Sequence, residues 1–350
     1  MLIPNGRLVS LQSARFLAAA GVVFAHAIDS AGALGISLLW SEIGSIGGIG
    51  AVGVDIFFVL SGFIITRTAF SGRNPSALTF LRHRYFRVAP IYYVASLLPL
   101  YIQLSSTGLN LSRLFVTLTF WPVLPKGMLT PLLYVGWTLC FEMLFYATVS
   151  IVLLRKGIGT GLLAGFGILL VLQSIWPMPL FNFVGNPIIL EFLFGVAIAR
   201  YSDRLPAQRL VSSSALTVGL IALLACALLG IGDVTEADRV IDGSRSWQRV
   251  ALLGIPSALI ILGLLGFEND LRKSKWAQGL SALGDASYSI YLFHGMAVLA
   301  VQSILQSTLL GQGYVLLAWS AGIAVGIVAY KLLERPLLSL GRKRRGVEFA

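Results

Sequence analysis

The chain has 350 residues, of which 57% are hydrophobic and 12% are charged, and its formal net charge is +11. Soluble globular proteins carry roughly 25% charged residues, so this composition excludes a soluble domain and predicts an integral membrane protein. The positive charges alternate with apolar stretches, as membrane insertion requires, and the sequence offers no site for nucleic acid.

The apolar stretches predict an all-α fold, a polytopic membrane bundle of about ten transmembrane helices, because about 20 residues span a bilayer. The predicted spans are 8–28, 49–68, 86–104, 132–154, 158–177, 187–200, 211–232, 249–267, 284–306 and 313–333. They form one membrane domain, residues 1–340, which a basic tail follows at 341–350. Lys and Arg gather in alternate connections, so both termini are predicted in the cytoplasm and the protein in the plasma (inner) membrane.

The beginning of the chain also allows a different interpretation. A signal peptide with its cleavage site would have similar features: here they are Arg7 and Arg15, an apolar run, and the sequence Ala25-His26-Ala27. Cleavage there would remove His26, and the remaining spans would still satisfy the charge rule. N-terminal sequencing of the mature protein distinguishes the two interpretations.

The first two spans each carry an ionisable residue at a similar depth. His26 lies about 18 residues, or roughly 27 Å, along the first helix, which brings it near the outer face. Asp55 lies a turn or two below that face on the second span, which runs in the opposite direction. We expect a carboxylate–imidazole pair, in which Asp55 orients His26 and the histidine activates a hydroxyl group. The alternative is a polar clamp between two helices.

Arg15 lies about two turns inside the first span, where a guanidinium needs an anionic partner. Glu142, near the middle of the fourth span, and Glu334, at the end of the last span, are the candidates. Trp137 and Phe141 lie at helical spacing on a face next to Glu142, and Trp137 could line the same path. Its alternative role is packing in the core or in the interfacial aromatic belt.

Arg84 and Arg87 follow the second span at a spacing of i, i+3, which places them on one face if that segment is helical. Two guanidiniums can bind a diphosphate or a 3′-phosphate through forked, charge-assisted hydrogen bonds. The alternative is that they reach toward lipid headgroups as topology anchors. His83, between them and the preceding Arg82, is expected in a loop.

Tyr288, Tyr291 and His294 recur every three residues in the ninth predicted span. This spacing places two phenols and an imidazole along one helical stripe. Such a stripe is costly when it faces lipid, so we expect it to face the interior of the bundle and to line a substrate path.

Six short motifs, in this order along the chain, together resemble the integral membrane acyltransferase 3 family, most closely its exopolysaccharide-modifying members. They are Arg15-Phe16-Leu17-Ala18 with His26, Gly53 to Phe63 with Asp55, Arg84 to Arg87 with Pro90, Trp137 to Tyr146 with Glu142, Ser287 to His294, and Glu334-Arg335-Pro336. The resemblance implies transfer of an acyl group from cytoplasmic acyl-CoA to a carbohydrate hydroxyl at or across the membrane. His26 matches the family's essential histidine, Arg84 and Arg87 match its RxxR pair, and the other site residues fall on recurrent positions.

The residues and the resemblance together predict a membrane O-acyltransferase that acts on a cell-envelope glycan or exopolysaccharide. In this hypothesis Arg84 and Arg87 bind acyl-CoA, with acetyl as the default acyl group and succinyl as an alternative. We expect no metal and no permanently bound cofactor, and we expect the lipid bilayer, acyl-CoA and a polysaccharide or lipid-linked glycan as partners. The rival functions are a glycan transporter or flippase and a non-catalytic scaffold of a polysaccharide export complex.

Overall fold

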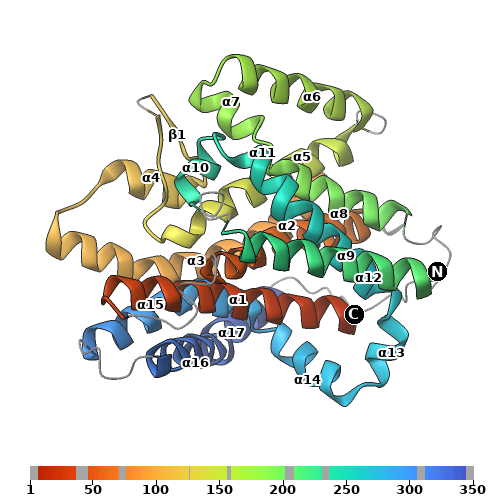
Figure 1. Ribbon diagram of the computed structural model, residues 1–350. Coiled ribbons are helices and arrows are strands. Elements are labelled where there is room, and N and C mark those ends of the chain that lie inside the picture. Colours follow the sequence, from red (N-terminus) through yellow and green to blue (C-terminus); the bar gives the residue numbers. More distant parts are fainter. Residues whose placement is uncertain are drawn as a thin grey trace. The chain divides into compact units, whose positions relative to one another are not determined.

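The computed structural model describes residues 7–36, 46–70, 76–125, 127–155, 159–201, 209–230, 236–305 and 312–343. Most of these residues are helical (Figure 1). The strands among them are two short pieces, β1 (Val123–Leu124) and β2 (Gly127–Met128), which pair antiparallel. The predicted all-α class is confirmed. The predicted basic tail, 341–350, lies for most of its length outside the described residues.

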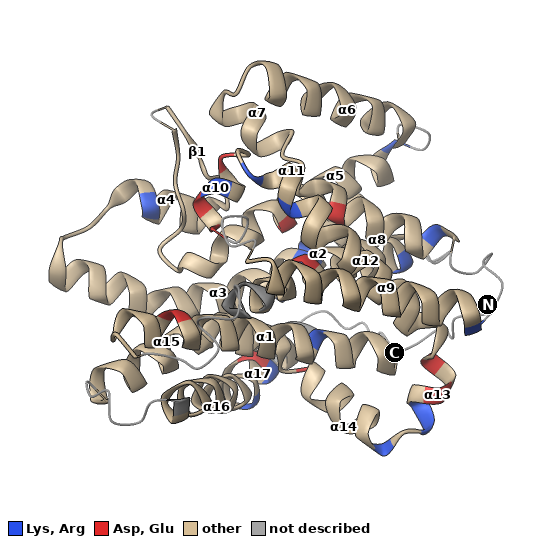
Figure 2. Cartoon of the chain, viewed as in Figure 1, with Lys and Arg blue, Asp and Glu red and all other residues tan. Residues whose placement is uncertain are grey.

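Eight helices within the described ranges are long and apolar enough to cross a membrane. They are Val9–Ala33, Gly50–Ala69, Ala77–Ser106, Tyr134–Leu154, Pro179–Tyr201, Arg209–Leu228, Ser246–Gly266 and Gly313–Ser339. Two further helices, α6 (Gly159–Ile175) and α15 (Ser287–Ile304), occupy the remaining predicted spans. Charged positions are sparse along most helices, whereas the short α13 carries both signs (Figure 2). The cytoplasmic position of the termini stays a prediction.

The chain forms two compact units, each of which is described by itself. Unit 1 comprises Met1–Thr66, Leu190–Thr235 and Gln248–Tyr330, and unit 2 comprises Arg67–Ile189, Glu236–Trp247 and Lys331–Ala350. The elements that lie mainly in unit 1 are α1 (Val9–Ala33), α2 (Ile46–Ala69), α8 (Ile189–Tyr201), α9 (Arg209–Leu228), the π-helix η3 (Val250–Gly254), α12 (Ile255–Gly266), α13 (Glu268–Lys273), α14 (Lys275–Gly284), α15 and α16 (Gln312–Ala329). Those of unit 2 are α3 (Ala77–Ser106), α4 (Leu111–Thr119), η1 (Tyr134–Gly136), α5 (Trp137–Leu154), α6, α7 (Pro179–Val184), α10 (Ala237–Ile241) and α17 (Arg335–Lys343). The short helix α11 (Ser246–Arg249) and the π-helix η5 (Tyr330–Glu334) cross the unit boundaries.

Helix α1 is the centre of unit 1, where it packs against α12, α13, α14, α15 and α16 (Figure 1). Small residues on its buried side, such as Ala19 and Ala27, are fully enclosed and let the neighbouring helices approach closely. At one end of the helix, Leu11 joins a core cluster with Phe63 of α2 and Ile261 of α12. The first helix is therefore held on several sides.

Helices α2 and α8 meet backbone to backbone at Gly62. A Cβ atom at this position would collide with the carbonyl oxygen of Phe192, so only glycine allows this approach. The fully buried Phe192 ring packs against Phe58 at a centroid distance of 4.7 Å. The contact fixes α2, which carries Asp55, against α8, which carries Glu191.

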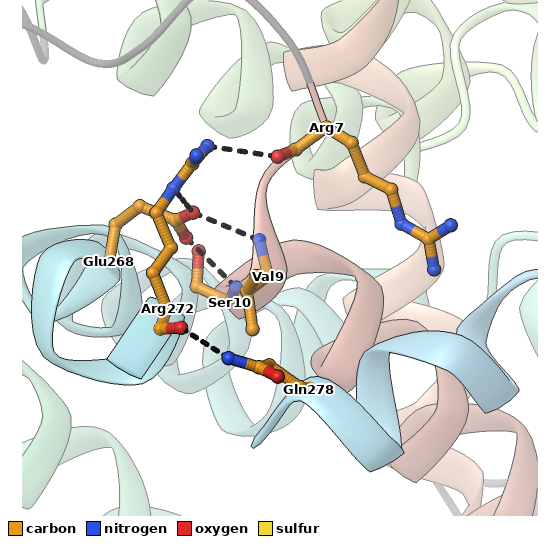
Figure 3. Close-up of polar contacts among 6 residues, drawn as sticks. All are labelled: Arg7, Val9, Ser10, Glu268, Arg272 and Gln278. Atoms are coloured by element: carbon orange, nitrogen blue, oxygen red, sulfur yellow. Dashed lines mark hydrogen bonds and ion pairs between the residues drawn. The ribbon is translucent and has the colours of Figure 1, made fainter. Parts of the chain in front are cut away.

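The N-terminal end of α1 is capped by another helix. Glu268 of α13 accepts hydrogen bonds from the backbone N–H groups of Val9 and Ser10 at 2.9 Å each (Figure 3). Arg272 donates to the Glu268 carboxylate at 2.7 Å and to the carbonyl oxygen of Arg7 at 2.9 Å. We call Glu268, Arg272 and the backbone groups that they bind the helix-end anchor. It satisfies N–H groups that a helix leaves open and places negative charge at the positive end of the helix dipole.

Unit 2 begins with α3, which starts before the predicted span. Ser76 caps this helix, because its hydroxyl oxygen accepts the backbone N–H of Thr79 at 3.2 Å. Arg84 and Arg87 consequently lie inside a helix, and the prediction of a loop at His83 was wrong. Hydropathy marks where the chain becomes apolar, whereas the helix starts at its capping residue.

Aromatic rings form much of the core of unit 2. Phe183 of α7 packs against Phe141 of α5 at 5.1 Å and edge-on to Trp121 at 5.4 Å. Trp137, at the start of α5, is buried and lies edge-on to Phe141 at 6.1 Å. Asn186 adds a polar link, because its amide donates to a backbone carbonyl oxygen of α10 at 2.8 Å.

Candidate functional site

Two histidines from distant parts of the chain meet inside unit 1. The rings of His26 on α1 and His294 on α15 have centroids 5.1 Å apart and planes inclined by 31°. One turn earlier on each helix, Val23 and Ile290 share a core cluster that sets the register of the two helices. We call His26 and His294 the histidine pair. The sequence predicted each residue as part of the site but did not predict their contact.

The hydrogen bond made by His294 fixes which of its nitrogens carries the proton. The ring is 1% exposed, and Nδ1 lies 3.1 Å from the carbonyl oxygen of Ile290. A carbonyl oxygen only accepts, so Nδ1 donates its hydrogen and Nε2 keeps a lone pair. Within the described part of the chain, Nε2 is buried and has no hydrogen-bond partner. His294 therefore presents an uncommitted acceptor next to His26.

His26 is the accessible member of the pair. Its side chain is 36% exposed, and Nδ1 lies 3.7 Å from a carboxylate oxygen of Asp29, one turn further along α1. This distance is too long for a hydrogen bond but short enough for an ion pair with a protonated ring. Asp29 itself is 70% exposed. The carboxylate beside His26 thus comes from its own helix.

The predicted partnership of Asp55 with His26 is not what the structure shows. The Asp55 carboxylate accepts two hydrogen bonds from Arg249, from Nε at 2.9 Å and from Nη2 at 2.8 Å. Both side chains are buried, with 0% and 1% exposure. Among the described residues no hydrogen bond or ion pair joins Asp55 to His26. A guanidinium provides two parallel donors and a full charge, so it is the stronger partner for a buried carboxylate.

Arg249 and Glu191 are buried polar residues that the sequence reasoning missed. Arg249 ends α11 just ahead of an apolar helix, a position that is typical of an interfacial anchor. Glu191 lies in the first turn of α8 and is 0% exposed. The signal that singled out Asp55, an ionisable residue within an apolar segment, also applies to Glu191. We call Asp55, Glu191 and Arg249 the buried carboxylate cluster.

The stripe predicted on the ninth span lies on α15. Tyr291 is 6% exposed, and its ring is edge-on to Phe57 of α2 at 5.8 Å and 6.2 Å from the His294 ring. Tyr288, one turn earlier, is half-buried. Within the stripe, Tyr291 thus links α15 to α2, and His294 links α15 to α1 through the histidine pair.

The two arginines of the RxxR motif lie in unit 2 with Glu142. Arg84 is half-buried, stacks over the ring of Phe80 at 5.6 Å and is close enough to feel the charge of Arg87. Tyr146 donates a short hydrogen bond of 2.5 Å to Glu142, which also lies near Arg84. Arg87 is exposed. One side of α3 thus offers a stacked guanidinium and an open one, the pair expected from the spacing.

The remaining predicted residues are placed by their burial and by the unit in which they lie. Arg15 is half-buried on α1 in unit 1. Glu334 is 3% exposed at the end of η5, in unit 2. An ion pair of Arg15 with Glu142 or Glu334 stays a prediction, and so does the part played by Trp137 in a substrate path.

Comparison with known proteins gives two matches. The sequence pattern of a protein family, described as "Acyltransferase domain", matches residues 8–333. A curated protein from Rhizobium meliloti (strain 1021), named "Exopolysaccharide production protein ExoZ", is 32% identical over 321 residues, which cover 85% of this chain and 92% of that protein. No solved structure matches the chain.

Proposed function

Because this chain belongs to the acyltransferase 3 family of membrane proteins, we propose that it transfers an acyl group from acyl-CoA to a hydroxyl group of an exopolysaccharide or related envelope glycan. The family pattern extends over both units, and the Rhizobium relative is named for exopolysaccharide production. That name supports a polysaccharide as the acceptor. Acyl-CoA is the donor that the family resemblance implies, with acetyl as the first acyl group to test.

The histidine pair is the observation that carries this proposal. Transfer to a hydroxyl group needs a base that removes the hydroxyl proton as the oxygen attacks the thioester carbonyl. We assign this role to His26, because its ring is accessible while His294 is enclosed. His294 takes over the part expected of Asp55, since its open Nε2 can accept the ring N–H of His26 and leave the other His26 nitrogen free as the base.

The proton can return within the same cycle. As the acceptor oxygen bonds to the acyl carbon, the carbon–sulfur bond breaks and the CoA thiolate leaves. The proton that His26 has taken then passes to this thiolate, so the reaction needs no further proton donor. Asp29, 3.7 Å from His26, stabilises the charged ring between the two proton transfers.

We assign the CoA phosphates to Arg84 and Arg87. The stack on Phe80 holds the plane of the Arg84 guanidinium, and Arg87 is exposed at the same side of α3. Replacing either arginine by alanine removes a charge-assisted contact with phosphate. We expect the KM for acyl-CoA to rise about ten- to a hundredfold while the KM for the glycan stays the same.

The proposal is tested with purified protein in proteoliposomes that contain glycan from cells lacking this protein. Radiolabelled acetyl-CoA should label the glycan, and unlabelled succinyl-CoA added in competition reports the preferred acyl group. Mass analysis of envelope polysaccharide from cells with and without the protein identifies the added group. Movement of labelled glycan across the vesicle membrane without acyl-CoA, and without acyl transfer, would identify a transporter and overturn the proposal.

A further inference from the structure

We propose that Glu191 is a proton-binding site inside unit 1, which keeps its proton in the folded protein while Asp55 alone balances the charge of Arg249. The inference goes beyond acyl transfer and does not depend on it. Its basis is the composition of the buried carboxylate cluster, which contains two carboxyl groups and one guanidinium.

Asp55 and Arg249 already form a complete ion pair. Two hydrogen bonds of 2.8 and 2.9 Å join them, and neither side chain reaches the surface. Arg249 also donates to the carbonyl oxygen of Ala51 at 3.2 Å. One positive and one negative charge cancel, so the cluster is neutral before Glu191 is counted.

Glu191 adds a second carboxyl group to this neutral pair. It is 0% exposed, it lies close enough to feel the charges of both Asp55 and Arg249, and neither of its oxygens accepts a hydrogen bond from a donor group in the described ranges. An ionised carboxylate without partners is very unfavourable in an apolar interior. The nearby Asp55 charge makes ionisation more costly still. A proton on Glu191 removes the excess charge and gives the group an O–H that can donate toward Asp55.

The backbone around Glu191 is shaped to hold its side chain. A Cβ atom at Gly254 would lie 2.6 Å from one Glu191 oxygen, so the carboxyl group occupies space that only glycine leaves open. Gly254 ends η3, the π-helical turn that starts directly after Arg249. Such turns are rare and are frequently found at functional sites. The ionisable groups around Glu191 come from three elements. Asp55 lies on α2 and Arg249 at the end of α11, and Tyr291 of α15 lies near the Arg249 guanidinium.

Infrared spectroscopy of the full-length protein in an ester-free detergent tests the proposal without an activity assay. A protonated carboxyl group has a carbonyl band that a carboxylate lacks. We expect wild-type protein at neutral pH to show such a band, Glu191→Gln to lose it and Glu268→Gln to keep it. Glu268 is the matched control because it is buried but bound to Arg272 and two N–H groups. An unchanged acid band in Glu191→Gln would overturn the proposal.

A chemical probe tests the same point on wild-type protein, which avoids any folding defect of a variant. Dicyclohexylcarbodiimide enters apolar regions and adds to the O–H form of a carboxyl group, ending as a stable N-acylurea that retains every atom of both reactants. Peptide mass analysis should find the adduct on Glu191, and Asp55 and Glu268 should stay unmodified. The labelling of Glu191 should fall as the pH is raised. Equal labelling of Glu191 and Glu268, or none on Glu191, would contradict the proposal.

Discussion

Unit 1 buries two glutamates whose carboxyl groups have very different surroundings. Glu268, 2% exposed, accepts two backbone N–H groups and an arginine at 2.7 to 2.9 Å. Glu191, 0% exposed, accepts no hydrogen bond from the described residues. Burial alone thus does not decide the charge of a carboxyl group. The number of donors that reach it does, because each donor replaces a hydrogen bond lost with water.

The same difference separates two kinds of buried polar group in this unit. In the helix-end anchor, the Glu268 carboxylate accepts hydrogen bonds from three donors, and these bonds hold α1 in place. The Glu191 oxygens and Nε2 of His294 are both buried and without a partner in the part of the chain that the structure describes. Native proteins leave few buried polar atoms unsatisfied, so each such atom needs an explanation, and the action of a proton or a ligand is one. Substitutions at four residues, Asp55, Glu191, His294 and Glu268, test this division.

The largest effect on stability should come from removing both carboxylates that face Arg249. The double variant Asp55→Asn with Glu191→Gln removes both carboxyl groups that lie near the buried Arg249 guanidinium, which costs about 3–5 kcal/mol. The single variant Asp55→Asn should lose clearly less, because Glu191 can release its proton and take over as counter-ion. Thermal unfolding in detergent measures both. A double variant that loses only the sum of the two single losses would show that Glu191 has no such reserve role.

The histidine pair should show its effect in activity. His294→Asn keeps a donor for the Ile290 carbonyl oxygen but removes the Nε2 acceptor, and we expect the transfer rate to fall about a hundredfold. His294→Gln is the matched variant, because it places an acceptor oxygen near the position of Nε2 and should restore part of the rate. If both variants lose the same activity, His294 acts through packing and not through its lone pair.

The helix-end anchor should respond with a moderate loss of stability. Glu268→Gln replaces a charged acceptor of three hydrogen bonds by a neutral one, so we expect a loss of about 1–2 kcal/mol. In this variant the Arg272 side chain, which is 39% exposed, stays in contact with water and does not become a buried unpaired charge. The melting temperature of the variant measures this loss, and an unchanged value would contradict the role of the anchor.

The smallest effect should be that of Glu191→Gln by itself. An amide has the shape of a protonated carboxyl group and the same charge, so we expect a change of less than about 1 kcal/mol at neutral pH. The comparison with Glu268→Gln is direct, because the same substitution is made at two buried sites of one unit. A larger loss at Glu191 than at Glu268 would mean that Glu191 is ionised.

The sequence predicted where the helices lie because hydropathy is a local property. The predicted span 132–154 corresponds to Tyr134–Leu154, and the apolar runs around His26 and Asp55 are helices α1 and α2. The i, i+3 spacing of Arg84 and Arg87 and the stripe that ends at His294 also follow from helical geometry alone. These predictions needed no knowledge of which helices are neighbours.

The partners within the site could not be predicted in this way. Asp55 required a cation, but whether His26 or Arg249 supplied it depends on how α2 packs against helices far away in sequence. Arg249 stands near the start of an apolar span, where a charged side chain is normally solvated. His26 and His294 are separated by most of the chain, and only the packing of α1 on α15 brings them together. Glu191 could have been predicted as a site residue from the sequence, because a carboxyl group in an apolar span is costly and usually functional.

The most direct test of the account is the rate of acyl transfer by His26→Ala in proteoliposomes, measured together with its melting temperature. We predict that transfer from acetyl-CoA to the glycan falls by about 10² to 10⁴ while the melting temperature stays close to that of the wild type, because His26 is partly exposed and acts as the base. A variant that folds normally and transfers the acyl group at the wild-type rate would contradict the central claim that the histidine pair performs the reaction.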